Sequence, residues 1–227
     1  MQQRYTPRGE SIRKAARQLD ETGNDNMGNE AVETPQKWVT TLFVQFNLVG
    51  NQCEHTVSVR EALDAYHAVI RQVIERHAGL LIASANDAVL ALFENAEPAD
   101  DHTHIGVSAA VATMEELAAL NKQRLEQNLI PFRVGIGLDT GCIAADKIRC
   151  HPFMATALEE HIHKAKGLSR LNQQAPFPAI FISRNTLDGL HSRNGYHVQN
   201  LGETFVPNLP VPVSVYALMR AYRVQQL

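Results

Sequence analysis

Carboxylate and imidazole side chains occur at a few places in this chain where they could bind a metal ion. Asp87 lies between two short apolar runs, LLIASA and AVLALF. The pairs His102-x-His104 and His161-x-His163 could present two imidazoles to one transition metal from a strand or a loop. Simpler interpretations exist, because an aspartate satisfies the backbone of a tight turn and chance pairs are common among ten histidines in 227 residues. The residues alone leave both interpretations open.

Three glycines, Gly135, Gly137 and Gly141, lie close together in the run FRVGIGLDTGC. A phosphate-binding loop is not indicated, because the run lacks GxGxxG spacing and a following lysine. We expect these glycines to permit a close backbone approach within the sheet or at a dimer interface. Glu159 and Glu160 are most simply exposed helix residues.

The composition excludes several classes of protein. The net charge is -3, and lysine and arginine are scattered, so nucleic acid is not an expected partner. Three cysteines without CxxC spacing argue against a disulfide framework and a zinc knuckle, and fit a reducing compartment. No run reaches the roughly 18 apolar residues of a membrane span. We therefore expect a cytoplasmic protein, or the cytoplasmic domain of a membrane-anchored one.

The chain is predicted to consist of a linker followed by one domain. Residues 1–36 contain the polar run DETGNDNMGNEAVETPQ, which has too few apolar groups to form a core, so a flexible linker is predicted. Such an extension is compatible with a preceding sensor or membrane domain in a longer chain. A folded domain is predicted over 37–227, beginning with the strand WVTTLFVQF.

The domain is predicted to have an α+β fold. Apolar periodicity predicts helices over 58–79, 104–128, 156–171 and 183–190, the first with a capping box at Ser58 and Glu61 and the last capped by Ser183. Hairpins are predicted with turns beside Asp87 and at Thr140-Gly141, and further strands at AIFIS, YHVQNLGETF and VPVSVYAL. The predicted order is β-α-β-β-α-β-β-α-β-α-β-β, with helices on one face of a ferredoxin-like sheet.

This order and four of its sequence words resemble the catalytic domain of class III adenylate and guanylate cyclases. VTTLFVQF resembles the first metal-binding strand, and ERHAGLLIASANDAVLALFENA resembles the hairpin that typically reads HGG and then KxxGDAVMAVF. PFRVGIGLDTGCIAADKI and PVSVYAL resemble the glycine-rich hairpin and the closing strand. The resemblance implies a mixed, mainly antiparallel sheet with helices packed on it, and a homodimer that forms the active site between its protomers.

In such enzymes two aspartates hold two metal ions, which activate the ribose 3'-hydroxyl and stabilise the charge at phosphorus. By resemblance the first aspartate falls on Gln45, a neutral amide, and the second on Asp87, which is retained but vestigial. The lysine that reads the base falls on Ala83. In the third helix GDxVNxAARL corresponds to LEEHIHKAKGL with an offset of one residue left open. The base-reading acid then falls on Glu159 or Glu160, and the asparagine falls on Ile162 or His163. The arginine falls on Lys166 or Gly167. The phosphate-binding lysine, which belongs to a later element, falls on Pro207.

We interpret the chain as a catalytically degenerate cyclase-like domain that acts as a dimerisation or regulatory module in signalling, without a cofactor. Loss of one oriented charge-stabilising group costs roughly a hundred- to a thousand-fold in rate, and several such positions are altered here. One alternative is a divergent adenylate or guanylate cyclase that uses Mg or Mn, with His163, Asp87 and Glu160 in new roles. Another is a sensor that binds a nucleotide or small ligand in the vacated cleft.

Overall fold

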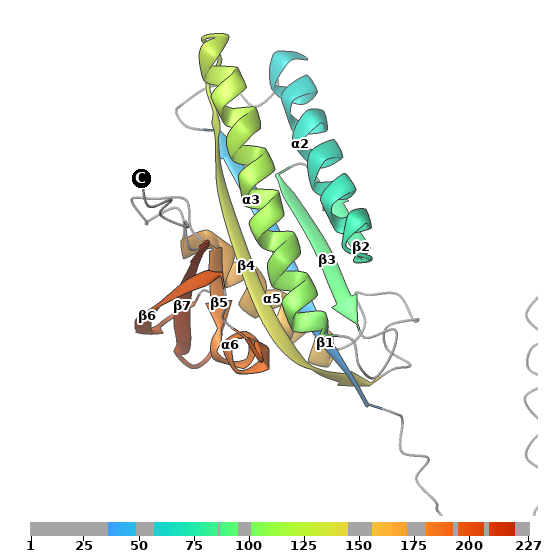
Figure 1. Ribbon diagram of the computed structural model, residues 1–227, viewed down its shortest axis with the longest axis vertical. Helices are drawn as coiled ribbons and strands as arrows, with labels where there is room; N and C mark the ends of the chain where they lie inside the picture. The colour runs from blue at the N-terminus through green and yellow to red at the C-terminus, as the bar shows by residue number, and fades with distance from the viewer. Residues whose placement is uncertain are drawn as a thin grey trace, which may run out of the picture. The chain divides into compact units, whose positions relative to one another are not determined.

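A seven-stranded mixed sheet with helices on both faces forms the described part of the chain (Figure 1). The structure, a computed structural model, describes residues 36–48, 57–85, 87–94, 101–144, 156–171, 180–192, 195–206 and 209–220. The strand order is β2-β3-β1-β4-β5-β7-β6. Every neighbouring pair is antiparallel except β4 and β5, which are parallel. The prediction of an α+β fold with a mixed, mainly antiparallel sheet is confirmed.

The elements follow one another as strands interrupted by helices. They are β1 Gln36–Leu48, α2 Val57–Arg76, β2 Leu80–Ala85, β3 Ala88–Glu94, α3 His102–Glu126, β4 Phe132–Ala144, α5 Thr156–Leu171, β5 Ile180–Ser183, α6 Arg184–Gly189, β6 Tyr196–Thr204 and β7 Val213–Arg220. The described part therefore holds one strand fewer than the sequence predicts. Among the described residues, no helix has both the length and the apolar character needed to cross a membrane.

β1 is buried on both of its faces, and this explains why helices cover both sides of the sheet. Leu42, Val44 and Phe46 point toward α2 and α3 and belong to the main core. Phe43, on the opposite face, packs with Ala165 of α5. Successive side chains of a strand alternate between faces, so the continuous apolar run of β1 needs a cover on each side. The prediction that the helices lie on one face is therefore wrong.

β4 is a single long strand rather than a hairpin. It pairs with β1 from Gln36↔Ala144 to Leu48↔Phe132 without interruption, so the predicted turn at Thr140-Gly141 is wrong. Thr140 lies opposite Thr40 in this ladder, and its hydroxyl is hydrogen-bonded to the Thr40 hydroxyl at 2.9 Å. Thr140 and Gly141 are thus paired residues within β4 and do not form a turn. The last residues of the predicted hairpin, 145–148, lie outside the described residues.

The helix boundaries agree with the sequence to within a turn. α2 begins at Val57, one residue before the predicted cap at Ser58. α3 begins at His102 and is capped by Asp101, whose side chain accepts a hydrogen bond from the His104 backbone N–H at 2.8 Å. α5 has the predicted bounds, and Ser183 caps α6 as predicted. The predicted linker lies outside the described residues, apart from its last residue, which begins β1.

Candidate functional site

Gln45 and Asp87, the two positions that resemble metal ligands, lie next to each other. Gln45 is on β1 opposite Ala88, and Asp87 is in the turn between β2 and β3. The Phe46 backbone N–H donates to the Asp87 carbonyl at 2.9 Å, and Gln45 Nε2 donates to Asp87 Oδ2 at 3.4 Å. Gln45 Oε1 is buried and has no hydrogen-bond partner among the described residues. The amide therefore turns its donor toward the carboxylate.

This pair does not fit two divalent cations. A dication of the Mg²⁺ or Mn²⁺ type is held by several oxygen ligands, usually with carboxylates among them. Here one carboxylate faces an amide nitrogen, and the pair carries a single negative charge. Across the ranges that the structure describes, no three His, Cys, Asp or Glu side chains are placed to share a metal ion.

The two His-x-His pairs do not converge on a metal either. Both pairs lie on helices, where residues i and i+2 point to different sides. On α3, His102 is buried and hydrogen-bonded to Thr40 at 2.9 Å, whereas the centre of the His104 ring lies 6.0 Å from that of the Tyr196 ring. On α5, His161 is buried and His163 is exposed. The sequence suggested a strand or a loop for these pairs, and the helical setting removes the metal-binding interpretation.

Ala83, at the base-reading position, lies in an apolar cluster between the sheet and α5. The buried members of this cluster come from β1, β3 and α5, and partly buried residues of β2, β3 and α5 pack against them. An irregularity in the β2–β3 register between Leu81 and Ala83 accompanies this packing. The buried members are Phe43, Leu90 and Ala165, and the others are Ile82, Ala83, Ala88 and Ile162.

The α5 side chains proposed by resemblance point in different directions. Glu160 is exposed and forms an ion pair with Lys164 at 2.7 Å, which holds the pKa of that carboxyl below its usual range. Ile162 joins the apolar cluster, and Lys166 places its Nζ 5.8 Å from the centre of the Phe43 ring. The Glu159 side chain lies outside the described residues. The structure thus unites Ala83 and Ile162 but gives Glu160 a partner on its own helix.

Gly167, the alternative arginine position, is covered by Val206. A Cβ atom added to Gly167 would lie 1.7 Å from Val206 Cγ1. Val206 is itself buried and follows β6 in the chain. No side chain larger than a hydrogen fits at position 167 while Val206 stays in place. Pro207, the position of the phosphate-binding lysine, lies outside the described residues.

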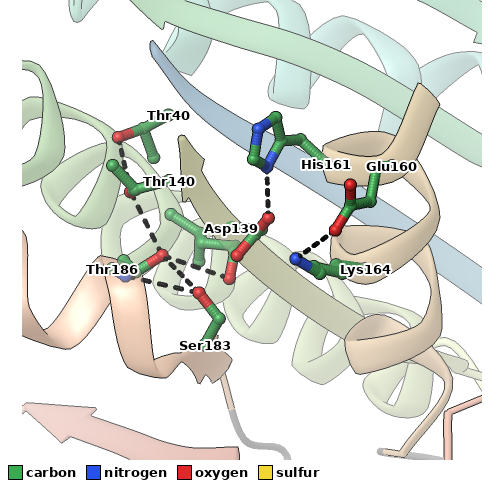
Figure 2. A network of polar contacts seen from close by, with 9 residues as sticks. Thr40, Asp139, Thr140, Glu160, His161, Lys164, Ser183 and Thr186 are labelled. Atoms are coloured by element: carbon green, nitrogen blue, oxygen red, sulfur yellow. Dashed lines mark hydrogen bonds and ion pairs between the residues drawn. The ribbon is translucent and has the colours of Figure 1, made fainter. Parts of the chain in front are cut away.

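A buried Asp139–His161 pair joins β4 to α5 and was not singled out from the sequence. Figure 2 shows the hydrogen bond between His161 Nδ1 and Asp139 Oδ2, which are 2.6 Å apart. Asp139 is fully buried, and its second oxygen, Oδ1, has no hydrogen-bond partner among the described residues. The signal available in the sequence was the spacing G-x-D-x-G, which places Asp139 between Gly137 and Gly141 on one face of a strand.

The two glycines beside Asp139 let α5 lie directly on β4. A Cβ atom on Gly137 would be 2.0 Å from the Ala165 carbonyl oxygen, and one on Gly141 would be 1.8 Å from the His161 ring. The expected close backbone approach is found at Gly137, whereas at Gly141 the atoms that come close belong to the His161 side chain. The approach is between a helix and a strand of the same chain.

A chain of buried hydroxyls on the other face of β4 links β1, β4 and α6 (Figure 2), and His102 of α3 joins this chain at Thr40. Thr40 is hydrogen-bonded to Thr140 at 2.9 Å and to His102 at 2.9 Å, and Thr140 donates to Thr186 of α6 at 3.1 Å. Burial lowers the pKa of His102, and the nearby Asp101 carboxylate opposes this only in part. Burial thus favours the neutral form of the His102 imidazole within this network.

A surface groove of about 690 Å³ lies along α2 at the end of β2. Its walls include Asp64, Arg71 and Glu75 of α2, and Ser84 of β2, whose hydroxyl is hydrogen-bonded to His67 at 2.7 Å. None of the positions proposed from the sequence lines this groove.

Comparison with known proteins gives structural but no sequence relatives. No protein-family model and no curated protein sequence matches the chain. The adenylyl cyclase CyaB from P. aeruginosa is 18% identical, with a TM-score of 0.63 over 85% of this chain and 98% of that one. The guanylyl cyclase Cya2 is 21% identical, with a TM-score of 0.59 over 86% of this chain and 98% of that one.

A third similar structure is the dimeric guanylyl cyclase domain of the RhoGC fusion protein from the aquatic fungus Blastocladiella emersonii. It is 14% identical, with a TM-score of 0.54 over 82% of this chain and 98% of that one. At these identities the likeness concerns the path of the chain, whereas the site has to be judged from its own residues. The chain has the fold of the class III adenylyl and guanylyl cyclase catalytic domains.

Proposed function

We propose that this chain is a catalytically degenerate cyclase-like domain that serves as a dimerisation and regulatory module in cytoplasmic signalling. The observation that carries the proposal is the Gln45–Asp87 pair. Two-metal catalysis requires carboxylates that fix two ions roughly 4 Å apart, and this pair supplies one carboxylate that already accepts a hydrogen bond from an amide. The ribose 3'-hydroxyl then has no means of activation.

The remaining positions support the same conclusion. An alanine in an apolar cluster cannot read the edge of a purine, because it offers no hydrogen-bond donor or acceptor. The arginine position is either Lys166, a point charge above a phenyl ring, or Gly167, which Val206 covers. A lysine does not reproduce the forked donors of a guanidinium. Base recognition and transition-state stabilisation are both lost by this account.

Exposed apolar side chains support the proposal that this domain self-associates, as the resemblance to cyclase domains implies. Leu201, Phe205 and Val211, at the end of the sheet formed by β6 and β7, are exposed by 44, 75 and 61%. Large apolar side chains exposed together favour a protein partner. One of the similar structures is described as a non-canonical dimeric domain of a fusion protein. We propose a homodimer in which this domain passes on a signal from a sensor or membrane domain that precedes it.

The test of the proposal is a cyclase assay on the full chain. ATP or GTP is incubated with the protein and Mn²⁺ or Mg²⁺, and cyclic nucleotide is measured against a Gln45→Ala/Asp87→Ala double variant. We expect equal background from both proteins. Cyclic nucleotide at a clear multiple of the double variant would refute the proposal and favour a divergent metal-dependent cyclase, with Asp87, Glu160 and His163 as the first residues to examine.

The same preparation tests for ligand binding without turnover. A thermal-shift screen of nucleotides, including cyclic dinucleotides, is expected to leave the melting temperature unchanged, because the cluster around Ala83 is apolar. A concentration-dependent rise with no product formed would indicate a sensor instead of an interaction module.

A further inference from the structure

Two oxygens without partners lie opposite each other beneath α5. Thr41 on β1 and Asp139 on β4 are direct cross-strand partners, and both are fully buried. Thr41 Oγ1 and Asp139 Oδ1 each lack a hydrogen-bond partner among the described residues, and they do not bond to each other. An unpaired buried carboxylate oxygen costs more than the mean worth of a hydrogen bond. Two such atoms on paired residues therefore call for a shared explanation.

No other described polar side chain is hydrogen-bonded to these two oxygens. On the same face of β1, Thr41 lies between Val39 and Phe43, which belong to two apolar clusters. On β4, Asp139 lies between Gly137 and Gly141, which have no side chains. His161 already uses its Nδ1 on Asp139 Oδ2. The site is a small polar spot enclosed by apolar walls and by the backbone of α5.

We infer that one water molecule is bound between Thr41 Oγ1 and Asp139 Oδ1 and is part of the contact between α5 and the sheet. Directly opposed Cβ atoms in an antiparallel pair are roughly 4.5 to 5.5 Å apart, a span that one water can bridge when no direct bond forms. Buried waters bind where about two to four polar partners are present. The water donates to the carboxylate oxygen that His161 does not reach, and it pairs with the hydroxyl of Thr41.

A metal cation is a poorer occupant of the same spot. The two oxygens are few for a cation, which takes about six or more oxygen ligands in the case of Ca²⁺. The carboxylate also already has a donor in His161, which supplies part of the compensation that a buried charge requires. Water matches the number and kind of atoms present.

Substitution of Thr41 separates a shared water from a truly unpaired hydroxyl. An unpaired buried hydroxyl is a liability, so Thr41→Val would then leave the full chain as stable as before or more stable. If the hydroxyl holds a water for Asp139, Thr41→Val lowers the folding equilibrium constant by roughly tenfold. Thr113→Val is the matched control, because Thr113 Oγ1 is also buried and unpartnered but belongs to α3. Urea unfolding of the three proteins gives the comparison.

A crystal structure of the full chain at high resolution gives the second readout. We expect a solvent peak within hydrogen-bonding distance of Thr41 Oγ1 and Asp139 Oδ1, present in the unaltered protein and absent in Thr41→Val. A Thr41→Val protein at least as stable as the unaltered one would overturn the inference. So would the lack of a peak where other buried waters are visible, or an anomalous signal at this spot in crystals soaked with rubidium.

Discussion

On one face of the sheet α2 and α3 pack through large apolar side chains, whereas on the other face α5 lies directly on β4. The first face holds an aromatic group in which the Phe46 ring is 5.8 Å from Tyr66 and 6.2 Å from Phe132. The second face has glycines at its closest contacts and a buried Asp139–His161 pair. The first face supplies most of the hydrophobic stabilisation, and the second sets the position of α5, which carries several of the residues named by resemblance.

The largest expected effect comes from the face covered by α2 and α3. Phe46→Ala removes a fully buried ring from the main core and should lower the free energy of unfolding by about 4 kcal/mol. Phe43→Ala, on the α5 face, should cost less, because Phe43 packs in a smaller cluster that contains several alanines. Chemical denaturation of both variants measures the difference. Equal losses would show that the two faces contribute alike.

A glycine substitution on each face sharpens the comparison. Gly137→Ala places a methyl group against the backbone of α5, which cannot move without undocking, so a loss of about 3 kcal/mol is expected. Gly106→Ala on α3 meets side-chain atoms of Thr40 at 2.9 Å and of Phe93 at 3.2 Å rather than the backbone of another element, and it also gains helix propensity, so it should be milder. The unfolding midpoints in urea test this order. A Gly106→Ala loss as large as that of Gly137→Ala would contradict it.

The effects of substitutions at Gly167 and Val206 on the free energy of unfolding should be coupled. Gly167→Ala creates an overlap with Val206 and is expected to cost about 2 kcal/mol of unfolding free energy. Val206→Ala makes the missing room, so the double variant should lose about 1 kcal/mol less than the sum of the single losses. A double-mutant cycle by urea unfolding measures this coupling. Strict additivity would mean that Val206 does not occupy the space above Gly167.

The smallest effect concerns pH and the face covered by α3. The pKa of His102 is lowered in the folded state, so the unfolded chain binds a proton first as the pH falls below about 6.5. Its contribution to stability is present above this pH and is lost as the pH falls toward the folded-state value. Unfolding free energy should therefore decline more steeply between pH 7 and 5 in the unaltered protein than in His102→Gln. Parallel curves would rule out this role, and the exposed His163→Gln serves as control.

Most of the fold could be predicted because its signals are local. Apolar periodicity predicted α5 with its observed bounds, and the capping propensity of Ser183 predicted the start of α6. The predicted turn at Thr140-Gly141 is absent because pairing along the whole of β1 outweighs the local turn propensity of these two residues. This pairing joins segments far apart in the sequence, so a short stretch of sequence does not reveal it. The second helical layer was missed although β1 is apolar on both faces.

The parts of the candidate site that lie in a sequence motif could be predicted. The contacts that arise from tertiary packing could not. The structure places Gln45 and Asp87, the two positions named by resemblance, beside each other, since they lie at fixed places in a strand and a hairpin. The Asp139–His161 pair joins residues 22 apart in the sequence through a helix docked on glycines. Only the docked structure shows that these two side chains meet. The contact of Val206 with Gly167 has no signal in the sequence.

The long β1–β4 ladder also affects how the chain is made. β1 can pair with β3 once residue 94 has been synthesised, but its other edge waits for the stretch that begins at Phe132. Until then WVTTLFVQF exposes an apolar, β-branched edge of the kind that recruits other chains. A ribosome that stalls before Phe132 would release a fragment prone to aggregate, and chaperone demand should fall once β4 has emerged.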